Sequence, residues 1–188
     1  IMSHCGVSRY AAMILLQMAL GAGIVKKHED NYILGKIGYF LLEDYTTKAN
    51  LDFVRDICYD SMKYLTESLS CGKPAGLKAL DVEGETLYQV LSVLPEKRKT
   101  SWLAFDHAYS DISFDKVLET VFSRKPGHIA DIGGNTGRWA LKCTEYDKDV
   151  KVTIIDMPGQ VKMAEKTIRE HGLEDRIKAI PADVLAAA

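Results

Sequence analysis

The pattern of apolar and polar residues in the first part of the chain alternates between helical and extended. Residues 7–20 carry apolar side chains on most sides of a helix, which is typical of a helix buried between other elements. Residues 24–27 and 31–34 are predicted to pair as a hairpin around the polar turn 28–30, and a short helix over 35–42 follows. The order helix, hairpin, helix predicts a winged-helix-like unit.

Longer helical patterns follow this unit. Asn50 is predicted to cap a helix over residues 51–69, in which apolar side chains recur near helical spacing until Gly72 and Pro74 end it. Further helices are predicted over residues 85–94 and 114–122, on either side of an aromatic-rich segment that spans residues 102–109. Residues 1–124 are therefore predicted to be mainly helical.

The pattern changes after a boundary signal, Lys-Pro-Gly, at residues 125–127. Strands are predicted over residues 128–132, 150–155 and 176–180, and helices over residues 136–145 and 158–171. Strands that alternate with helices are typical of a parallel sheet with helical crossovers. The predicted fold class is α/β, with a mainly helical, winged-helix-like region over 1–124 and the first βαβαβ part of an incomplete Rossmann-like domain over 125–188.

Composition and charge narrow the function classes. Apolar residues make up 47% and charged residues 27% of the 188 residues, as in ordinary globular proteins. A net charge of -2 argues against a general nucleic-acid-binding protein, because such proteins usually carry an excess of basic residues. The four cysteines form no C-x-x-C pair, so we predict reduced thiols in a cytoplasmic protein, without a metal site or disulfide framework.

The apolar segment over residues 10–25 follows Arg9 and superficially resembles a signal peptide. A bilayer span takes roughly 20 apolar residues, and Gln17 interrupts this shorter segment. We therefore predict a buried helix here and no membrane partner.

The most informative segment is the glycine-rich loop after the first predicted strand of the second domain, Asp131-Ile132-Gly133-Gly134-Asn135-Thr136-Gly137. Glycines permit a sharp turn and a close approach of a ligand to the backbone. Asp156 follows the second predicted strand and Asp183 the third, where carboxylates can accept hydrogen bonds from ribose hydroxyls and from an exocyclic amine. Taken singly, the glycines could form a tight turn without a ligand, Asp156 could cap the following helix, and Asp183 could be a solvated acid. The three features together predict a nucleoside site.

The charge beside the loop distinguishes two kinds of cofactor. Asn135 and Arg138 stand where a dinucleotide-binding G-x-G-x-x-G loop counted from Gly133 has glycines. Asp131 would repel a pyrophosphate but attract the α-ammonium group of S-adenosylmethionine, which also carries a sulfonium charge. The loop therefore favours S-adenosylmethionine over a dinucleotide.

These segments resemble the cofactor motifs of the plant and bacterial S-adenosylmethionine-dependent O-methyltransferases. DIGGNTG, DMP and RIKAIPADVL resemble that family's DxGGGTG, DLP and RI…GD followed by two apolar residues. The resemblance implies a methyl transfer to a hydroxyl of a small-molecule acceptor, with cofactor-binding residues at Asp131, Gly133, Gly134, Asn135, Gly137, Asp156, Met157 and Asp183. Within this set it places Asp156 at the ribose, Met157 against adenine and Asp183 at the adenine edge.

Residues 105–113, FDHAYSDIS, resemble the family's FNxxMSDxS stretch. This resemblance implies that Ser113 approaches the cofactor, and that Phe105, Asp106 and Tyr109 border the acceptor. It further implies that the helical region forms a homodimer. Asn135 for glycine, Asp106 for asparagine and Tyr109 for methionine depart from the family pattern and leave the acceptor open.

The family's general base is a histidine after a fourth strand, and no histidine of this chain stands in that motif. The chain closes on three alanines, residues 186–188, and only a short segment, residues 181–185, separates them from the third predicted strand. We therefore expect the catalytic base to lie beyond residue 188, in a longer natural protein with a more complete Rossmann-like domain, and the chain alone to be inactive. The alternative functions are a winged-helix DNA-binding regulator, a methyltransferase-like binding protein without catalysis and a dinucleotide oxidoreductase.

Overall fold

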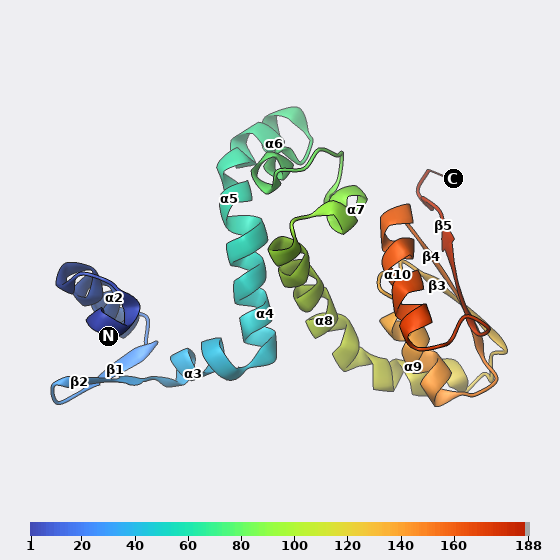
Figure 1. The fold of residues 1–188 in the computed structure, drawn as a ribbon, viewed down its shortest axis with the longest axis horizontal. Coiled ribbons are helices and arrows are strands. Elements are labelled where there is room, and N and C mark those ends of the chain that lie inside the picture. Colours follow the sequence, from blue (N-terminus) through green and yellow to red (C-terminus); the bar gives the residue numbers. More distant parts are fainter. Residues whose placement is uncertain (187–188) are drawn as a thin grey trace. The chain divides into compact units, whose positions relative to one another are not determined.

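The computed structural model describes residues 1–186, so the last two terminal alanines lie outside the described residues. The described residues form two compact units, one over Ile1–Asp52 and one from Phe53 onward. We predicted a boundary near residue 125, where the sheet begins; the compact units divide earlier along the chain. Figure 1 labels the elements, which are α1 (Met2–Cys5), α2 (Arg9–Gly21), β1 (Val25–His28), β2 (Asn31–Leu34), α3 (Lys36–Glu43), α4 (Tyr45–Phe53), α5 (Tyr59–Ser61), α6 (Leu65–Cys71), α7 (Leu87–Val90), α8 (Glu96–Phe122), β3 (His128–Ile132), α9 (Arg138–Tyr146), β4 (Lys151–Asp156), α10 (Pro158–Glu170) and β5 (Ile177–Pro181).

The first unit has the predicted order of helix, hairpin and helix. Ser8 caps α2 by accepting a hydrogen bond from the Ala11 backbone N–H at 3.2 Å, and β1 pairs with β2 in an antiparallel hairpin. Gly38 weakens the intrinsic helix propensity of α3, but packing requires it. A Cβ there would lie 2.4 Å from the Ile24 carbonyl oxygen.

The prediction that the first long helix is buried is wrong for the described chain. Only Ala12 of α2 is buried, whereas Tyr10, Leu15 and Met18 are each more than half exposed. A unit of this size offers neighbours for one side of the helix only, so the remaining apolar side chains face outward.

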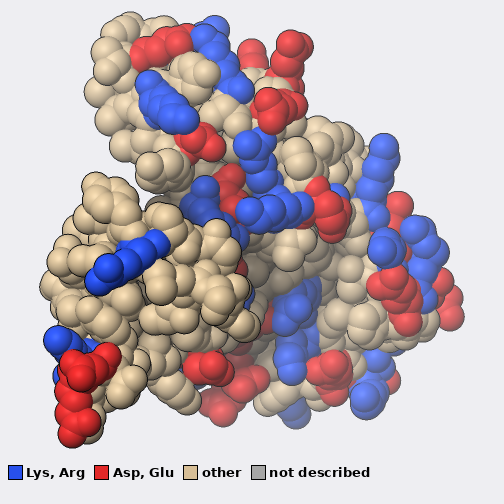
Figure 2. All heavy atoms as spheres, turned by 60° about the vertical axis from the view of Figure 1, so that its left-hand side comes forward, with Lys and Arg blue, Asp and Glu red and all other residues tan. Residues whose placement is uncertain are grey.

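Figure 2 shows basic and acidic side chains interspersed on one face of the molecule, with wide uncharged areas between them.

A long helical run spans from α4 to α6, and it begins earlier than predicted. Asp44 precedes α4 and accepts from the Thr47 backbone N–H at 2.8 Å, so the helix begins at Tyr45. The predicted cap at Asn50 is wrong, because its Nδ2 donates to the Thr46 carbonyl inside the helix. The run contains a π-helical turn, Val54–Cys58, and a 3₁₀ turn, Met62–Tyr64, and it ends at Gly72 in the left-handed conformation, as predicted.

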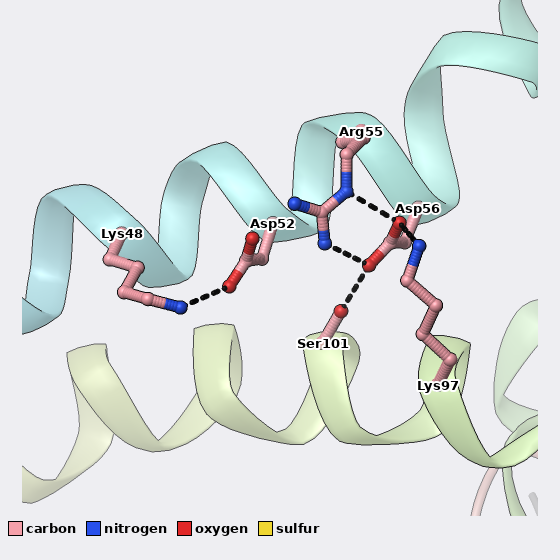
Figure 3. Close-up of polar contacts among 6 residues, drawn as sticks. All are labelled: Lys48, Asp52, Arg55, Asp56, Lys97 and Ser101. Atoms are coloured by element: carbon pink, nitrogen blue, oxygen red, sulfur yellow. Dashed lines mark hydrogen bonds and ion pairs between the residues drawn. The ribbon is translucent and has the colours of Figure 1, made fainter. Parts of the chain in front are cut away.

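Asp56 in the π-helical turn is the centre of a polar contact between this helical run and α8 (Figure 3). Its side chain is 4% exposed and accepts from Arg55 Nε and Nη2, from Ser101 Oγ at 2.6 Å and from Lys97 Nζ at 2.9 Å. The Arg55 hydrogen bond, ahead of those from Ser101 and Lys97, holds the pKa of Asp56 well below its ordinary value.

Replacing Asp56 with alanine is expected to lower the free energy of unfolding by about 2 kcal/mol at pH 7, because charge-assisted hydrogen bonds are lost. The penalty stays modest since Arg55 and Lys97 are largely exposed and regain water. Urea unfolding measures it, with Asp60→Ala as control, since Asp60 forms an exposed pair with Lys63. Because the Asp56 pKa is lowered, its contribution is complete above pH ~4 and lost as pH falls below that. Equal effects of the two variants would contradict this role.

Helix α8 joins two hydrophobic clusters in the second unit. Trp102, near its start, packs in a cluster with Ile57, Val90 and Leu94, and Leu118 and Phe122, near its end, pack in the core of the sheet. We predicted an aromatic segment and a short helix here; the structure has one 27-residue helix.

The sheet is parallel, as predicted, and its strand order is β3-β4-β5. Its central strand β4 buries Val152 and Ile154, and α9 and α10 pack against the sheet through Ala140, Cys143, Ala164 and Ile168. Figure 1 shows α10 alongside the strands. Among residues 1–186, each helix is either too short or too polar to span a bilayer.

Candidate functional site

The loop between β3 and α9 turns sharply across the carboxyl ends of two strands. Gly133, Asn135 and Gly137 have φ values of 75°, 48° and 84°, all in the left-handed region that glycine and, less readily, asparagine adopt. The Gly133 N–H donates to the Ile155 carbonyl of β4 at 2.8 Å, which holds the loop against the neighbouring strand.

Asp156, at the end of β4, holds the loop through a hydrogen bond to its backbone. Its Oδ2 accepts from the Asn135 backbone N–H and its Oδ1 from the Met157 backbone N–H, both at 2.7 Å. The side chain therefore does not cap α10, whose first residue is Pro158. Each carboxylate oxygen keeps lone-pair capacity for a further donor.

Asp131, next to the end of β3, is half-buried and has one buried carboxylate oxygen. Its Oδ2 is buried and no hydrogen-bond partner is found for it in the structure. Burial, and next the charge of Asp156, raise the pKa of Asp131 to about 6. Gly134 makes room for this carboxylate, because a Cβ there would lie 2.5 Å from Asp131 Oδ2.

Helix α8 contacts the loop and the start of α9 at three points. Asn135 Nδ2 donates to Asp106 Oδ2 at 2.9 Å, His107 Nε2 lies 3.1 Å from Thr136 Oγ1, and Arg138 pairs with Asp111 through two nitrogens. Burial, followed by the Arg138 charge, lowers the pKa of His107.

Two cavities of about 250 Å³ each lie beside the loop, and Asp106, Gly133 and Asn135 line both. The first cavity also has Asp131 and Gly134 in its wall. The second is bounded by Asp156 and by one residue from each of four helical elements, namely Tyr88, Leu91, Trp102 and Gln160. Gln160 is buried and its Nε2 donates to the Tyr88 carbonyl at 2.8 Å, which joins α7 to α10 at this wall.

The structure thus brings six of the predicted residues around one pair of cavities: Asp106, Asp131, Gly133, Gly134, Asn135 and Asp156. Sequence reasoning missed Tyr88, Leu91 and Gln160, which carry no motif. Trp102 belongs to the aromatic segment that the sequence singled out.

Other predicted residues have different surroundings in the described chain. Ser113 is exposed and donates to the Ser110 carbonyl at 2.7 Å, and it is Ser110 that lines a cavity. Phe105 stacks on Phe53 with ring centroids 4.1 Å apart, and Tyr109 lies against Phe105.

Three more predicted residues lie at turns. Asp183 is exposed and accepts from the backbone N–H groups of Leu185 and Ala186. Met157 immediately precedes α10, and Gly137 immediately precedes α9. In the described residues, no group of three or more His, Cys, Asp and Glu side chains is arranged to hold a metal.

The chain is similar to known proteins in sequence and in fold. The chain is 25% identical over 185 residues to an L-tyrosine C(3)-methyltransferase from Streptomyces lavendulae, covering 97% of this chain and 50% of the relative. The apo structure of the S-adenosylmethionine-dependent methyltransferase SibL matches 97% of this chain and 54% of its own, with 27% identity and a TM-score of 0.64. The chain resembles S-adenosylmethionine-dependent methyltransferases in sequence and in fold.

The O-methyltransferase NcsB1 from neocarzinostatin biosynthesis shares the fold. Its complex with S-adenosyl-L-homocysteine and 1,4-dihydroxy-2-naphthoic acid matches 97% of this chain and 56% of its own, with a TM-score of 0.67 and 17% identity. No family model matches the chain. The chain spans about half the length of these relatives.

Proposed function

We propose that this chain binds S-adenosylmethionine at the glycine-rich loop, as part of a protein that methylates a hydroxyl of a small molecule. The observation that carries the proposal is Asp131, whose Oδ2 is buried without a hydrogen-bond partner beside a cavity and the glycine-rich loop. A buried anion is costly unless a cation pairs with it, and the cofactor's α-ammonium group is such a cation.

The charges around the loop support this cofactor over a phosphate-bearing one. Asp106, Asp131 and Asp156 border the two cavities, and Arg138, the arginine in the wall of the first cavity, pairs with Asp111. A pyrophosphate would meet these carboxylates without a free arginine to offset them. This arrangement argues against the dinucleotide oxidoreductase.

The two cavities suit the two ends of the cofactor. The cavity beside Asp131 would take the methionine end, and the cavity beside Asp156 the nucleoside, whose ribose hydroxyls can donate to that carboxylate. We carry the remaining assignments over from the family resemblance as proposals. These are Gly133, Gly134, Asn135, Gly137 and Ser113 near the methionine end, Met157 and Asp183 at adenine, and Phe105, Asp106 and Tyr109 toward the acceptor.

When bound, S-adenosylmethionine supplies an activated methyl group on a sulfonium leaving group. The described residues would orient it: the loop and Asp156 fix the nucleoside, and Asp131 fixes the ammonium group. Transfer to a hydroxyl forms a C–O bond, breaks the C–S bond and releases the hydroxyl proton to a base. We assign no residue of this chain as that base.

The L-tyrosine C(3)-methyltransferase supports an alternative acceptor, an aromatic carbon. A methylated carbon would lose its ring proton, whereas a methylated oxygen would lose its hydroxyl proton. Proton NMR of the product distinguishes the two, because an O-methyl and an aryl C-methyl group resonate at different chemical shifts.

We further propose that the protein is a cytoplasmic homodimer with a small-molecule partner and no nucleic-acid partner. The exposed apolar side chains of α2, among them Tyr10, Leu15 and Met18, support a protein partner, because such surfaces are commonly covered by another chain. All four cysteines are free thiols, which fits a reducing compartment.

Calorimetric titration of S-adenosylmethionine into the purified protein at its natural length tests the cofactor. We expect saturable binding, and an affinity at least about tenfold lower in Asp156→Ala, because both the loop anchor and the ribose acceptor are lost. The matched control is Asp115→Ala on the exposed side of α8, which should bind like the wild type. Binding that is unchanged in Asp156→Ala, or NAD binding in place of S-adenosylmethionine, would refute the proposal.

A further inference from the structure

Asn135 and Asp106 form a side-chain pair where α8 meets the glycine-rich loop. Asn135 Nδ2 donates to Asp106 Oδ2 at 2.9 Å, and this bond fixes which way the amide points. The carbonyl oxygen of the same amide, Oδ1, therefore points away from Asp106. It is buried and has no hydrogen-bond partner in the structure. The pair thus leaves one buried acceptor unused.

A second unused acceptor belongs to the same wall. Asp131 Oδ2 is likewise buried without a partner, and a Cβ on Gly134, the residue before Asn135 in the chain, would lie 2.5 Å from it. Asp106, Asp131 and Asn135 all line the same cavity of about 250 Å³. Arg138, also in that wall, already pairs with Asp111 and does not neutralise these groups.

An ammonium group has three N–H donors, and this wall offers acceptors from three side chains. We propose that Asp106 is a second anionic contact, beside Asp131, for the α-ammonium group of the cofactor, and that Asn135 positions Asp106 while its own Oδ1 serves as the third acceptor. This inference rests on the proposed function, because it concerns the same ligand. It moves Asp106 from the acceptor side, where the family resemblance places it, to the cofactor side.

The place of Asp106 in both cavities agrees with this role. It borders the cavity of Asp131 and also that of Asp156, so it lies where the amino-acid end of the ligand would continue into the nucleoside. A purely structural role, in which Asp106 only holds Asn135, predicts that both ends of the ligand are affected alike when Asp106 changes.

The test compares two ligands that share the thioadenosine part. S-adenosylhomocysteine carries the amino-acid end, and 5′-methylthioadenosine has a methyl group in its place. Asp106→Asn keeps an oxygen that can accept from Asn135 Nδ2 but removes the charge. We expect calorimetry to show an affinity about tenfold lower for S-adenosylhomocysteine, since a charge-assisted bond becomes a neutral one, and less than a twofold change for 5′-methylthioadenosine.

Two further variants sharpen the comparison. Asp115→Asn, on the same helix, should change neither affinity. Asn135→Gly removes the positioning contact, and in that background Asp106→Asn should cost less for S-adenosylhomocysteine than it does in the wild type.

Each other outcome overturns the inference in a distinct way. Equal losses for both ligands in Asp106→Asn would assign Asp106 to loop structure, and no loss for either would exclude the contact. A wild-type protein that binds neither ligand would refute the proposed function itself, and the inference with it.

Discussion

Replacing Gly134 with alanine is expected to reduce the affinity for S-adenosylmethionine by at least about tenfold. The new Cβ would lie 2.5 Å from Asp131 Oδ2 and 3.0 Å from Cγ2 of Ile154, which is fully buried. Ile154 cannot move without disturbing the core, so the Asp131 carboxylate must rotate away from the place where it would meet the cofactor. Overpacking of this kind also costs about 1–3 kcal/mol of stability. Calorimetry and urea unfolding measure the two effects.

Gly127 provides the matched control. A Cβ on Gly127 would meet nothing within 4 Å, and neither Gly127 nor Gly134 has a positive φ, so backbone strain does not enter the comparison. Gly127→Ala should therefore keep both the affinity and the stability of the wild type. If Gly134→Ala also behaved like the wild type, the loop would not hold Asp131 as described.

The second large effect concerns pH, and it has opposite signs for stability and for binding. The folded chain holds the Asp131 proton more tightly than the unfolded chain, because the pKa is about 6 instead of the ordinary 3.8. The free energy of unfolding should therefore fall as pH rises from about 4 to about 6 and then level off, by at most about 3 kcal/mol from this group. Chemical unfolding at a series of pH values measures this slope.

Cofactor binding should strengthen over the range where stability falls. The ammonium group pairs with the ionised carboxylate, so the affinity for S-adenosylmethionine should rise about tenfold between pH 5 and pH 7.5 for a group of pKa about 6. Asp131→Asn should bind weakly and lose this pH dependence. A wild-type affinity that is flat over this range would show that the ligand does not meet the Asp131 carboxylate.

The sheet was predictable from sequence because its signals are local. Strands β3 to β5 each show a short apolar run, and Pro158 and Gly172 punctuate α10 as predicted. Helix α8 escaped prediction as one element because its buried side changes partner along its length. Trp102 faces one cluster and Phe122 another, which breaks the single apolar stripe that identifies a helix.

The candidate site divides in the same way. The acids and glycines of the loop could be predicted because each ends or follows a strand, where parallel sheets bind ligands. Tyr88 and Leu91 could not, since only tertiary packing brings them to Asp156, and Gln160 carries no motif although it follows Asp156 by four residues. Asn50 shows the converse, a residue with the right chemistry for a cap that lies one turn inside a helix already capped by Asp44.

Helix α8 has a consequence for cooperativity. It extends about 40 Å, at 1.5 Å per residue, and is shared by both hydrophobic clusters of the second unit. Neither cluster can melt alone without breaking this helix between Trp102 and Leu118, in the stretch that also carries Asp106, His107 and Asp111. Local unfolding of the cluster around Trp102 would therefore also disturb the contacts between α8 and the glycine-rich loop. We expect both hydrophobic clusters of the second unit to unfold in a single transition.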